Sequence, residues 1–214
     1  MLALNWPNRI TIIRILLIGP FVIALLHLRE PGWGEFARRS ALVLFFLMAV
    51  SDGLDGWLAR RLRQESMAGR ILDPVADKLL ILFSMLLLAG EGTAVPGARI
   101  PPAVAVIAIG KDIIVTVGFC VVYLTTSRLY IEPRRSGKWC TAAQLAMILA
   151  VLLAPDLPRP LGAAPRVLWY AATALALAAI VQYYLAGVRF IDAHEPRPAE
   201  SGPPAPPESR GRQP

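Results

Sequence analysis

The chain has 214 residues, of which 56% are hydrophobic and 17% are charged, and its formal net charge is +7. Soluble domains average about 45–50% apolar and about 25% charged residues, so this composition excludes an ordinary soluble domain and indicates a membrane protein with several spans. Because the basic residues are spread over loops without interleaved aromatic residues, we interpret the charge as attraction to anionic lipid headgroups and expect no nucleic acid partner.

Apolar blocks recur along the chain at about the 20-residue length that crosses a bilayer as a helix. The sequence predicts six helices, at roughly 10–28, 40–59, 71–90, 101–125, 140–154 and 167–188. The first is expected to be retained, because it is too long for the apolar core of a signal peptide and no Ala-x-Ala-like cleavage site follows it. The fifth is short unless it extends back through Lys138, whose side chain can reach the membrane surface.

The expected fold is an all-α integral membrane domain of six transmembrane helices, spanning residues 1–190. Residues 191–214 are rich in proline and lack aromatic side chains, so we expect a disordered tail. Lys and Arg residues mark cytoplasmic loops, and they are denser in the 60–70 and 127–138 connections than in the 91–100 and 155–166 loops, although the first loop argues the other way. Both termini and the polar stretch 51–78 are therefore predicted to be cytoplasmic, most simply at the cell membrane.

Four aspartates lie in that polar stretch. Asp52 and Asp55 are three residues apart, and Asp73 and Asp77 are four apart, so each pair shares one face of a helix. The short link between the two helices predicts antiparallel neighbours whose aspartates lie at the same level near the cytoplasmic surface and can point at each other. Four carboxylates beside hydrocarbon would repel one another, and two Mg²⁺ or Mn²⁺ ions, which prefer oxygen ligands, would resolve this.

Small residues and arginines accompany the aspartates. Gly56, Ala59 and Gly69 leave room for a flat or bulky ligand group beside the helix backbone, and Arg60 and Arg61 suit phosphate oxygens. Any single aspartate here is more often a helix cap than a ligand. All four at paired helical spacing favour a metal site that binds a diphosphate-bearing substrate.

The pattern D-x-x-D-G-x-x-A-R-x₈-G-x-x-x-D-x-x-x-D resembles the signature of the CDP-alcohol phosphatidyltransferases. Its fixed positions are Asp52, Asp55, Gly56, Ala59, Arg60, Gly69, Asp73 and Asp77. NWPNRITIIR near the N-terminus and SGKWCTAAQ after the fourth block resemble further parts of that family. The resemblance implies six transmembrane helices, a homodimer, and a metal site in a polar cavity at the cytoplasmic side. It also implies transfer of a phosphatidyl group from a CDP-linked lipid to an alcohol with release of CMP.

The resemblance also implies roles for individual residues. The two metal ions would be bound by Asp52, Asp55, Asp73 and Asp77, and Asp77 would also be the general base. The nucleotide of CDP-diacylglycerol would be bound by Asn8, Thr11, Gly56, Ala59, Arg60 and Gly69.

The LDPVADK and SGKWCTAAQ patterns are most similar to the phosphatidylglycerophosphate synthase branch, whose acceptor is glycerol 3-phosphate. A phosphorylated acceptor needs cationic partners, and the candidates are Arg14, Lys111, Arg135 and Lys138. Lys111 lies beside Asp112 within an apolar block, so it must face a cavity or that carboxylate. Gly110-Lys111-Asp112 stands where many of that branch have Ala-Arg-Glu, which leaves open a CDP-alcohol-type cardiolipin synthase that uses phosphatidylglycerol.

Two further classes are less supported. An ion-coupled transporter would place charges near the middle of broken helices, whereas these acids cluster at one side of the membrane. A non-catalytic scaffold gives no reason to keep four mutually repelling carboxylates. No other metal-ligating residues stand at suitable spacing near Cys120 or Cys140 in the sequence, and we expect both cysteines to be buried small residues.

Overall fold

The computed structural model describes the backbone of residues 6–62, 67–126 and 135–194, and the side chains of residues 11–51, 75–118 and 137–186. These residues form six α-helices: α1 (Trp6–Leu26), α2 (Gly34–Leu62), α3 (Met67–Ala89), α4 (Pro102–Thr126), α5 (Arg135–Leu153) and α6 (Ala164–His194). Two short 3₁₀ helices, η1 (Ala154–Asp156) and η2 (Arg159–Leu161), lie between α5 and α6. Since the described residues contain no strand, the predicted all-α class is confirmed.

Each helix corresponds to one predicted apolar block, but several extend well beyond it. α2 begins six residues before position 40, and α6 continues six residues past position 188. At a rise of about 1.5 Å per residue, the 29 residues of α2 measure about 43 Å, which exceeds the roughly 30 Å hydrocarbon core of a bilayer. Helical hydrogen bonding therefore continues beyond the predicted blocks into polar flanks, such as residues 34–39 of α2 and 189–194 of α6.

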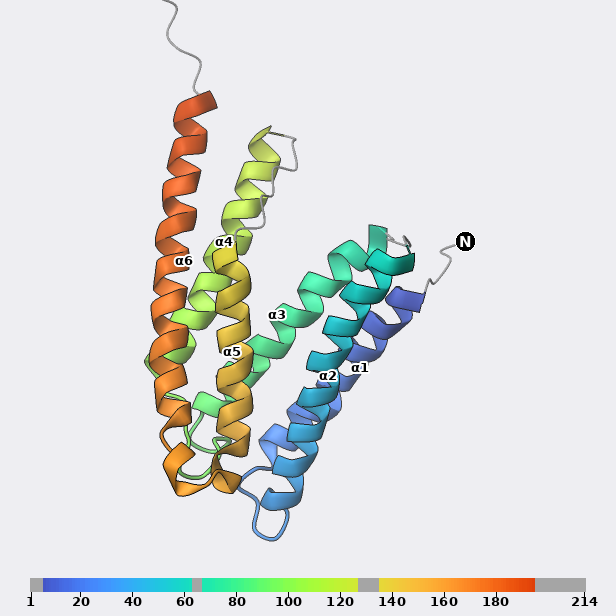
Figure 1. Ribbon diagram of the computed structural model, residues 1–214, viewed down its shortest axis with the longest axis vertical. Coiled ribbons are helices and arrows are strands. Elements are labelled where there is room, and N and C mark those ends of the chain that lie inside the picture. Colours follow the sequence, from blue (N-terminus) through green and yellow to red (C-terminus); the bar gives the residue numbers. More distant parts are fainter. Residues whose placement is uncertain (1–5, 63–66, 127–134, 195–214) are drawn as a thin grey trace, which may run out of the picture.

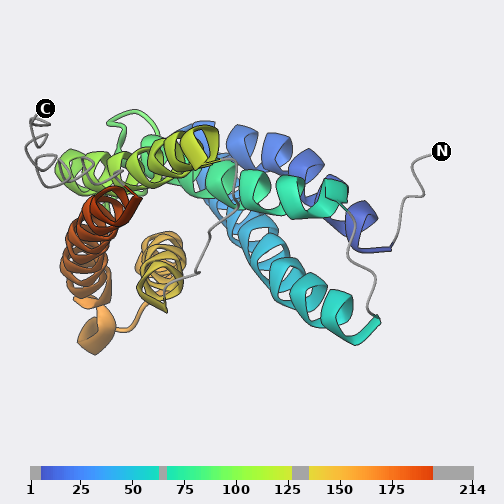
Figure 2. The same ribbon diagram turned by 90° about the horizontal axis from the view of Figure 1, so that it is seen from above.

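The six helices form two layers, with α1, α3 and α4 in one and α2, α5 and α6 in the other (Figure 2). α1 packs against both α2 and α3, α3 packs against α4, and α6 packs against α4 and α5. The end of α2 and the start of α3, where the two helices were expected to meet, have side chains outside the described residues, so their direct contact stays a prediction. A short link restricts only the distance between two helix ends, and α3 packs mainly along α1 while α2 diverges into the other layer.

The core lies between the two layers. Phe21 of α1 and Phe45 of α2 are buried, with ring centroids 6.1 Å apart. The same cluster includes Met85 of α3 and Met147 of α5, and small residues such as Ala105 contribute from α4. Small side chains let helices approach closely, which supports packing inside a membrane as well as in water.

Large apolar side chains are exposed on every one of the six helices. Leu16, Val106 and Tyr170 are each more than two thirds exposed, at 68%, 69% and 77%. Extensive exposed apolar surface marks contact with a membrane or a partner. Among the described residues, Gly137–Asp156 and Arg159–Ala186 are long and apolar enough to span a membrane, and Thr11–Leu26 is apolar but shorter. The number of six spans stays a prediction.

The helices alternate in direction, so their ends gather at two ends of the molecule (Figure 1). α1, α3 and α5 begin, and α2, α4 and α6 end, at what we call the site end. The opposite end holds the connections at 27–33, 90–101 and 154–163. The residues singled out in the sequence therefore lie toward one end of the fold, although they come from five helices.

Candidate functional site

The four aspartates lie on the two helices that meet at the site end. Asp52 and Asp55 are on the last turns of α2, and Asp73 and Asp77 are on the first turns of α3. The side chains of the first three lie outside the described residues, and only that of Asp77 is described. Within the described side chains, no three potential metal ligands come together, so the four-carboxylate cluster stays a prediction.

Asp77 is bound by an arginine from the neighbouring helix. Arg14 of α1 donates from a terminal guanidinium nitrogen to Oδ1 of Asp77 at 3.1 Å, and its side chain is only 1% exposed, whereas that of Asp77 is 35% exposed. A buried cation is tolerated when a carboxylate pairs with it. Arg14, which we expected to contact the acceptor, therefore lies beside Asp77 and positions that carboxylate, which remains accessible from one side.

A second charged group continues from this pair into α4. Lys111 donates to Oδ1 of Asp112 at 2.7 Å, and Lys78 of α3 donates to the same oxygen. Lys111 and Asp112 are largely buried, and Lys78 is about 40% exposed. The expectation that Lys111 faces a cavity or Asp112 is confirmed by this contact.

Lys78 was not identified as a site residue from the sequence. It follows Asp77 directly, and its partner Asp112 is 34 residues away, so no local spacing rule connects the two residues. Its position directly after the last aspartate of the signature was the available signal. An ammonium group inside an otherwise apolar helix needs a partner, and α4 supplies it.

The charges of this described group do not balance. Its cations are Lys78 and Lys111 and its carboxylate is Asp112, which leaves one excess positive charge (two minus one). Inside a protein such an excess favours an anion more strongly than it would in water. The arrangement can therefore attract a phosphate group next to an accessible carboxylate.

α5 adds polar groups to this layer. Cys140 is buried, as expected from the sequence. Gln144, one turn further along α5, is fully buried, and neither its amide oxygen nor its amide nitrogen has a hydrogen-bond partner among the described residues. Unsatisfied buried amides are rare, which makes Gln144 a further candidate site residue. It is the last residue of the SGKWCTAAQ pattern, but sequence reasoning gave it no role.

The other predicted acceptor cations lie at the start of α5. Lys138 is exposed in the first turns of that helix. Arg135 is the first residue of the helix, and its side chain lies outside the described residues. Of the four predicted acceptor cations, the structure thus buries Arg14 beside Asp77 and Lys111 beside Asp112, and it leaves Lys138 exposed.

The predicted nucleotide-binding residues all lie at the site end. Asn8 and Thr11 are in the first turns of α1, and the remaining four are Gly56, Ala59 and Arg60 near the end of α2 and Gly69 near the start of α3. Among these side chains only that of Thr11 is described, and it is buried. Thr11 lies three residues before Arg14, so the two share one face of α1.

The sequence of the chain is similar to one protein family and to several curated proteins. The family profile described as CDP-alcohol phosphatidyltransferase matches residues 4–186. Three curated proteins named CDP-diacylglycerol–glycerol-3-phosphate 3-phosphatidyltransferase are similar to the chain. The protein from Cereibacter sphaeroides is 30% identical over 72% of this chain and 66% of its own length. The protein from Pseudomonas fluorescens is 41% identical over 53% of both chains. The protein from Aquifex aeolicus is 32% identical over 69% of this chain and 75% of its own length. The aligned part of the chain thus spans between half and two thirds of the first two relatives.

Proposed function

This chain belongs to the CDP-alcohol phosphatidyltransferase family, and on that basis we propose that it transfers the phosphatidyl group of CDP-diacylglycerol to glycerol 3-phosphate and releases CMP. The names of the three relatives favour glycerol 3-phosphate over phosphatidylglycerol as the acceptor. The observation that carries the proposal is the placement of Asp77, the last aspartate of the signature, directly before Lys78, which with Lys111 and Asp112 forms a group with one excess positive charge.

Divalent metal ions fit the donor set at the site end. α2 ends and α3 begins at the same end of the molecule (Figure 1), so the two aspartate pairs lie at a similar level. Carboxylate oxygens are the ligands that Mg²⁺ and Mn²⁺ prefer, and we assign the ligands as Asp52, Asp55, Asp73 and Asp77. When bound, two such ions would neutralise the diphosphate and the charge that develops on the leaving CMP.

Asp77 is proposed as the general base. The acceptor hydroxyl oxygen attacks the phosphorus atom of the phosphatidyl group, the bond from that phosphorus to the CMP oxygen breaks, and the hydroxyl proton passes to a carboxylate oxygen of Asp77. Arg14 positions that carboxylate from α1 through the 3.1 Å hydrogen bond. No covalent intermediate with the protein is required.

The acceptor phosphate is proposed to bind at the lysines of α3 and α4. Lys111 and Lys78 share one oxygen of Asp112, so their combined charge exceeds that of their partner. Arg135 and Lys138 at the start of α5 are proposed to complete the approach to this site. The nucleotide is assigned to the opposite flank of the aspartates, at Asn8, Thr11, Gly56, Ala59, Arg60 and Gly69.

The apolar side chains exposed on the helices support a location in a membrane. We propose an integral protein of the cell membrane with six spans, a polar cavity open to the cytoplasm and both termini on that side. Residues 1–190 were expected to form the catalytic domain, but α6 continues to His194, so the proposed tail begins after that helix, and 195–214 lie outside the described residues. The family resemblance suggests a homodimer.

The deciding experiment is an assay of the purified protein with CDP-diacylglycerol and single acceptors. We expect CMP and phosphatidylglycerol phosphate to form in equal amounts with glycerol 3-phosphate. Turnover with phosphatidylglycerol alone would assign the protein to the cardiolipin synthases. Release of CDP or inorganic phosphate would show that a different bond is cleaved.

A further inference from the structure

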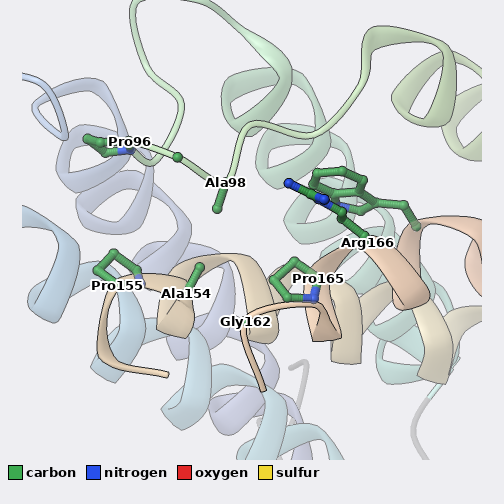
Figure 3. A pocket seen from close by; sticks show the side chains of 9 residues that line it. Pro96, Ala98, Ala154, Pro155, Gly162, Pro165 and Arg166 are labelled. Carbon is green, nitrogen blue, oxygen red and sulfur yellow. The ribbon is translucent and has the colours of Figure 1, made fainter. Parts of the chain in front are cut away.

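A cavity of about 180 Å³ lies at the end of the molecule opposite the candidate site. Its lining residues are Pro96, Gly97, Ala98, Ala154, Pro155, Gly162, Pro165, Arg166 and Trp169. Figure 3 shows Pro96 and Ala98 of the α3–α4 loop on one side and Ala154 and Pro155 across from them, with Arg166 reaching back toward the loop. Gly97 has a φ of +77°, a conformation that favours glycine and shapes this wall.

The position of the cavity relative to a membrane follows from its two flanking helices. The stretches Gly137–Asp156 and Arg159–Ala186 are both long and apolar enough to span a bilayer, and the cavity lies at the turn between them. A turn between two consecutive spans lies at the depth of the lipid headgroups. This step rests on the membrane setting given under the proposed function, but not on the proposed reaction.

The cavity offers donors for an anion and contains no carboxylate. Arg166 is exposed and has no hydrogen-bond or ion-pair partner among the described residues. The indole Nε1 of Trp169 is buried and likewise has no hydrogen-bond partner among them. Both residues lie in the first two turns of α6, where the helix dipole also favours negative charge.

We propose that this cavity binds the phosphate group of a membrane phospholipid in the leaflet opposite the catalytic site. The guanidinium of Arg166 pairs with the phosphate, and the indole N–H of Trp169 donates to one of its oxygens. The volume is below the roughly 300–1,000 Å³ of pockets that enclose drug-sized ligands, so it suits a headgroup phosphate whose acyl chains extend along the exposed apolar surface of α5 and α6.

The test uses the full-length protein in a neutral detergent and counts bound lipids by native mass spectrometry. The probe is dihexanoyl phosphatidylglycerol, and dihexanoylglycerol is the matched lipid without phosphate. The variants are Arg166→Gln and Trp169→Phe, which removes only the N–H donor and keeps an aromatic ring. Arg159→Gln is the control, because Arg159 is an exposed arginine of the same connection that does not line the cavity. Circular dichroism verifies that each variant remains helical.

We expect Arg166→Gln and Trp169→Phe each to weaken binding of one phosphatidylglycerol by roughly tenfold, the effect of losing one hydrogen bond to a charged group. Arg159→Gln should bind as the wild type does, and dihexanoylglycerol should not occupy the site. Wild-type binding by both cavity variants would overturn the proposal. Displacement of the lipid by inorganic phosphate at equal concentration would also overturn it, because the site would then recognise the free ion.

Discussion

Asp77 is the one aspartate of the signature whose surroundings are described, and its partner comes from another helix. The bond to Arg14 positions the carboxylate, and Lys78 continues the polar layer from the next position of α3 toward Asp112. A base that must take a proton from a weakly acidic hydroxyl needs such a fixed position. The proposed role can be separated from metal binding by a substitution that keeps the size of the side chain.

Asp77→Asn should reduce turnover at saturating substrates by roughly 10²–10⁴-fold, which is the usual contribution of a general base. The amide keeps an oxygen that can ligate a metal but cannot accept the proton, so binding of CDP-diacylglycerol should persist. Asp52→Asn should instead weaken binding of metal and nucleotide. Glu91→Gln, at an exposed carboxylate of the opposite end, is the control. Near-normal turnover in Asp77→Asn would refute the general-base role of Asp77, but it would not contradict the proposed metal site.

Lys111→Met should raise the KM for glycerol 3-phosphate by about tenfold or more and change the KM for CDP-diacylglycerol much less. The ammonium of Lys111 is buried, so solvent screens its attraction to a phosphate only weakly. Asp112 keeps Lys78 as its partner in this variant, which protects the fold. Lys138→Ala should act in the same direction but less, since Lys138 is exposed. Equal changes in both KM values would place Lys111 outside the acceptor site.

At the scale of the helices, Arg38 joins the start of α2 to the end of α5. Its buried guanidinium donates to the carbonyl oxygen of Leu152 at 2.7 Å and pairs with Asp156 at 2.8 Å. The last carbonyl groups of a helix lack partners within that helix, so this arginine caps α5 from a neighbouring element. The contact helps to hold the layer formed by α2, α5 and α6 at the end opposite the site.

Arg38→Met should lower the stability of the protein by about 1–3 kcal/mol, because the carbonyl of Leu152 loses a charged donor. Arg39→Met is the matched control, since Arg39 is exposed and its ion pair within the described part of the chain is with Glu35, on its own helix. We expect its unfolding midpoint to stay close to that of the wild type. Thermal unfolding in detergent measures both variants. Equal destabilisation by the two would mean that the contact with α5 contributes little.

The start of α2 should also respond to acid. Hydrogen bonds from Arg38 and then Arg39 lower the pKa of Glu35 from 4.5 to about 2, and Glu35 lies outside the predicted membrane block 40–59. Because the folded-state pKa is lowered, its stabilising contribution is present above about pH 4.5 and is lost as the pH falls toward 2. Wild type should therefore be more stable than Glu35→Gln near neutral pH, and the difference in unfolding midpoint should shrink over that interval. A constant difference across the interval would contradict the ion-pair explanation.

At the scale of the whole molecule, alternation of helix direction brings the start of α1, the end of α2 and the start of α3 to one end (Figure 1). The proposed metal ligands all lie on helices of this end. Chelation should therefore abolish transfer, and either Mg²⁺ or Mn²⁺ should restore it when it is added back in excess of the chelator. Reactions that contain EDTA and no added metal measure the residual rate of transfer. Full turnover there would exclude metal-dependent catalysis.

The sequence predicted the helices well, because an apolar block of membrane length has few alternatives. All six blocks are helices among the described residues. Their neighbours were predicted less well, since apolar faces in such a chain pack on several partners with similar energy. For example, no spacing in the sequence predicted that α1 lies against both α2 and α3.

By itself, the sequence determined the helical class, the helix number, the family and the positions of the four aspartates, because these depend on local composition and on fixed spacing along one helix. Only the tertiary structure decided which charges meet. Arg14 and Asp77 are 63 residues apart, and Lys78 and Asp112 are 34 apart. The cavity beside Arg166 and Trp169 likewise joins residues of the α3–α4 loop, the end of α5 and the start of α6. Such pairings depend on how the two layers of helices pack, and no local periodicity encodes that packing.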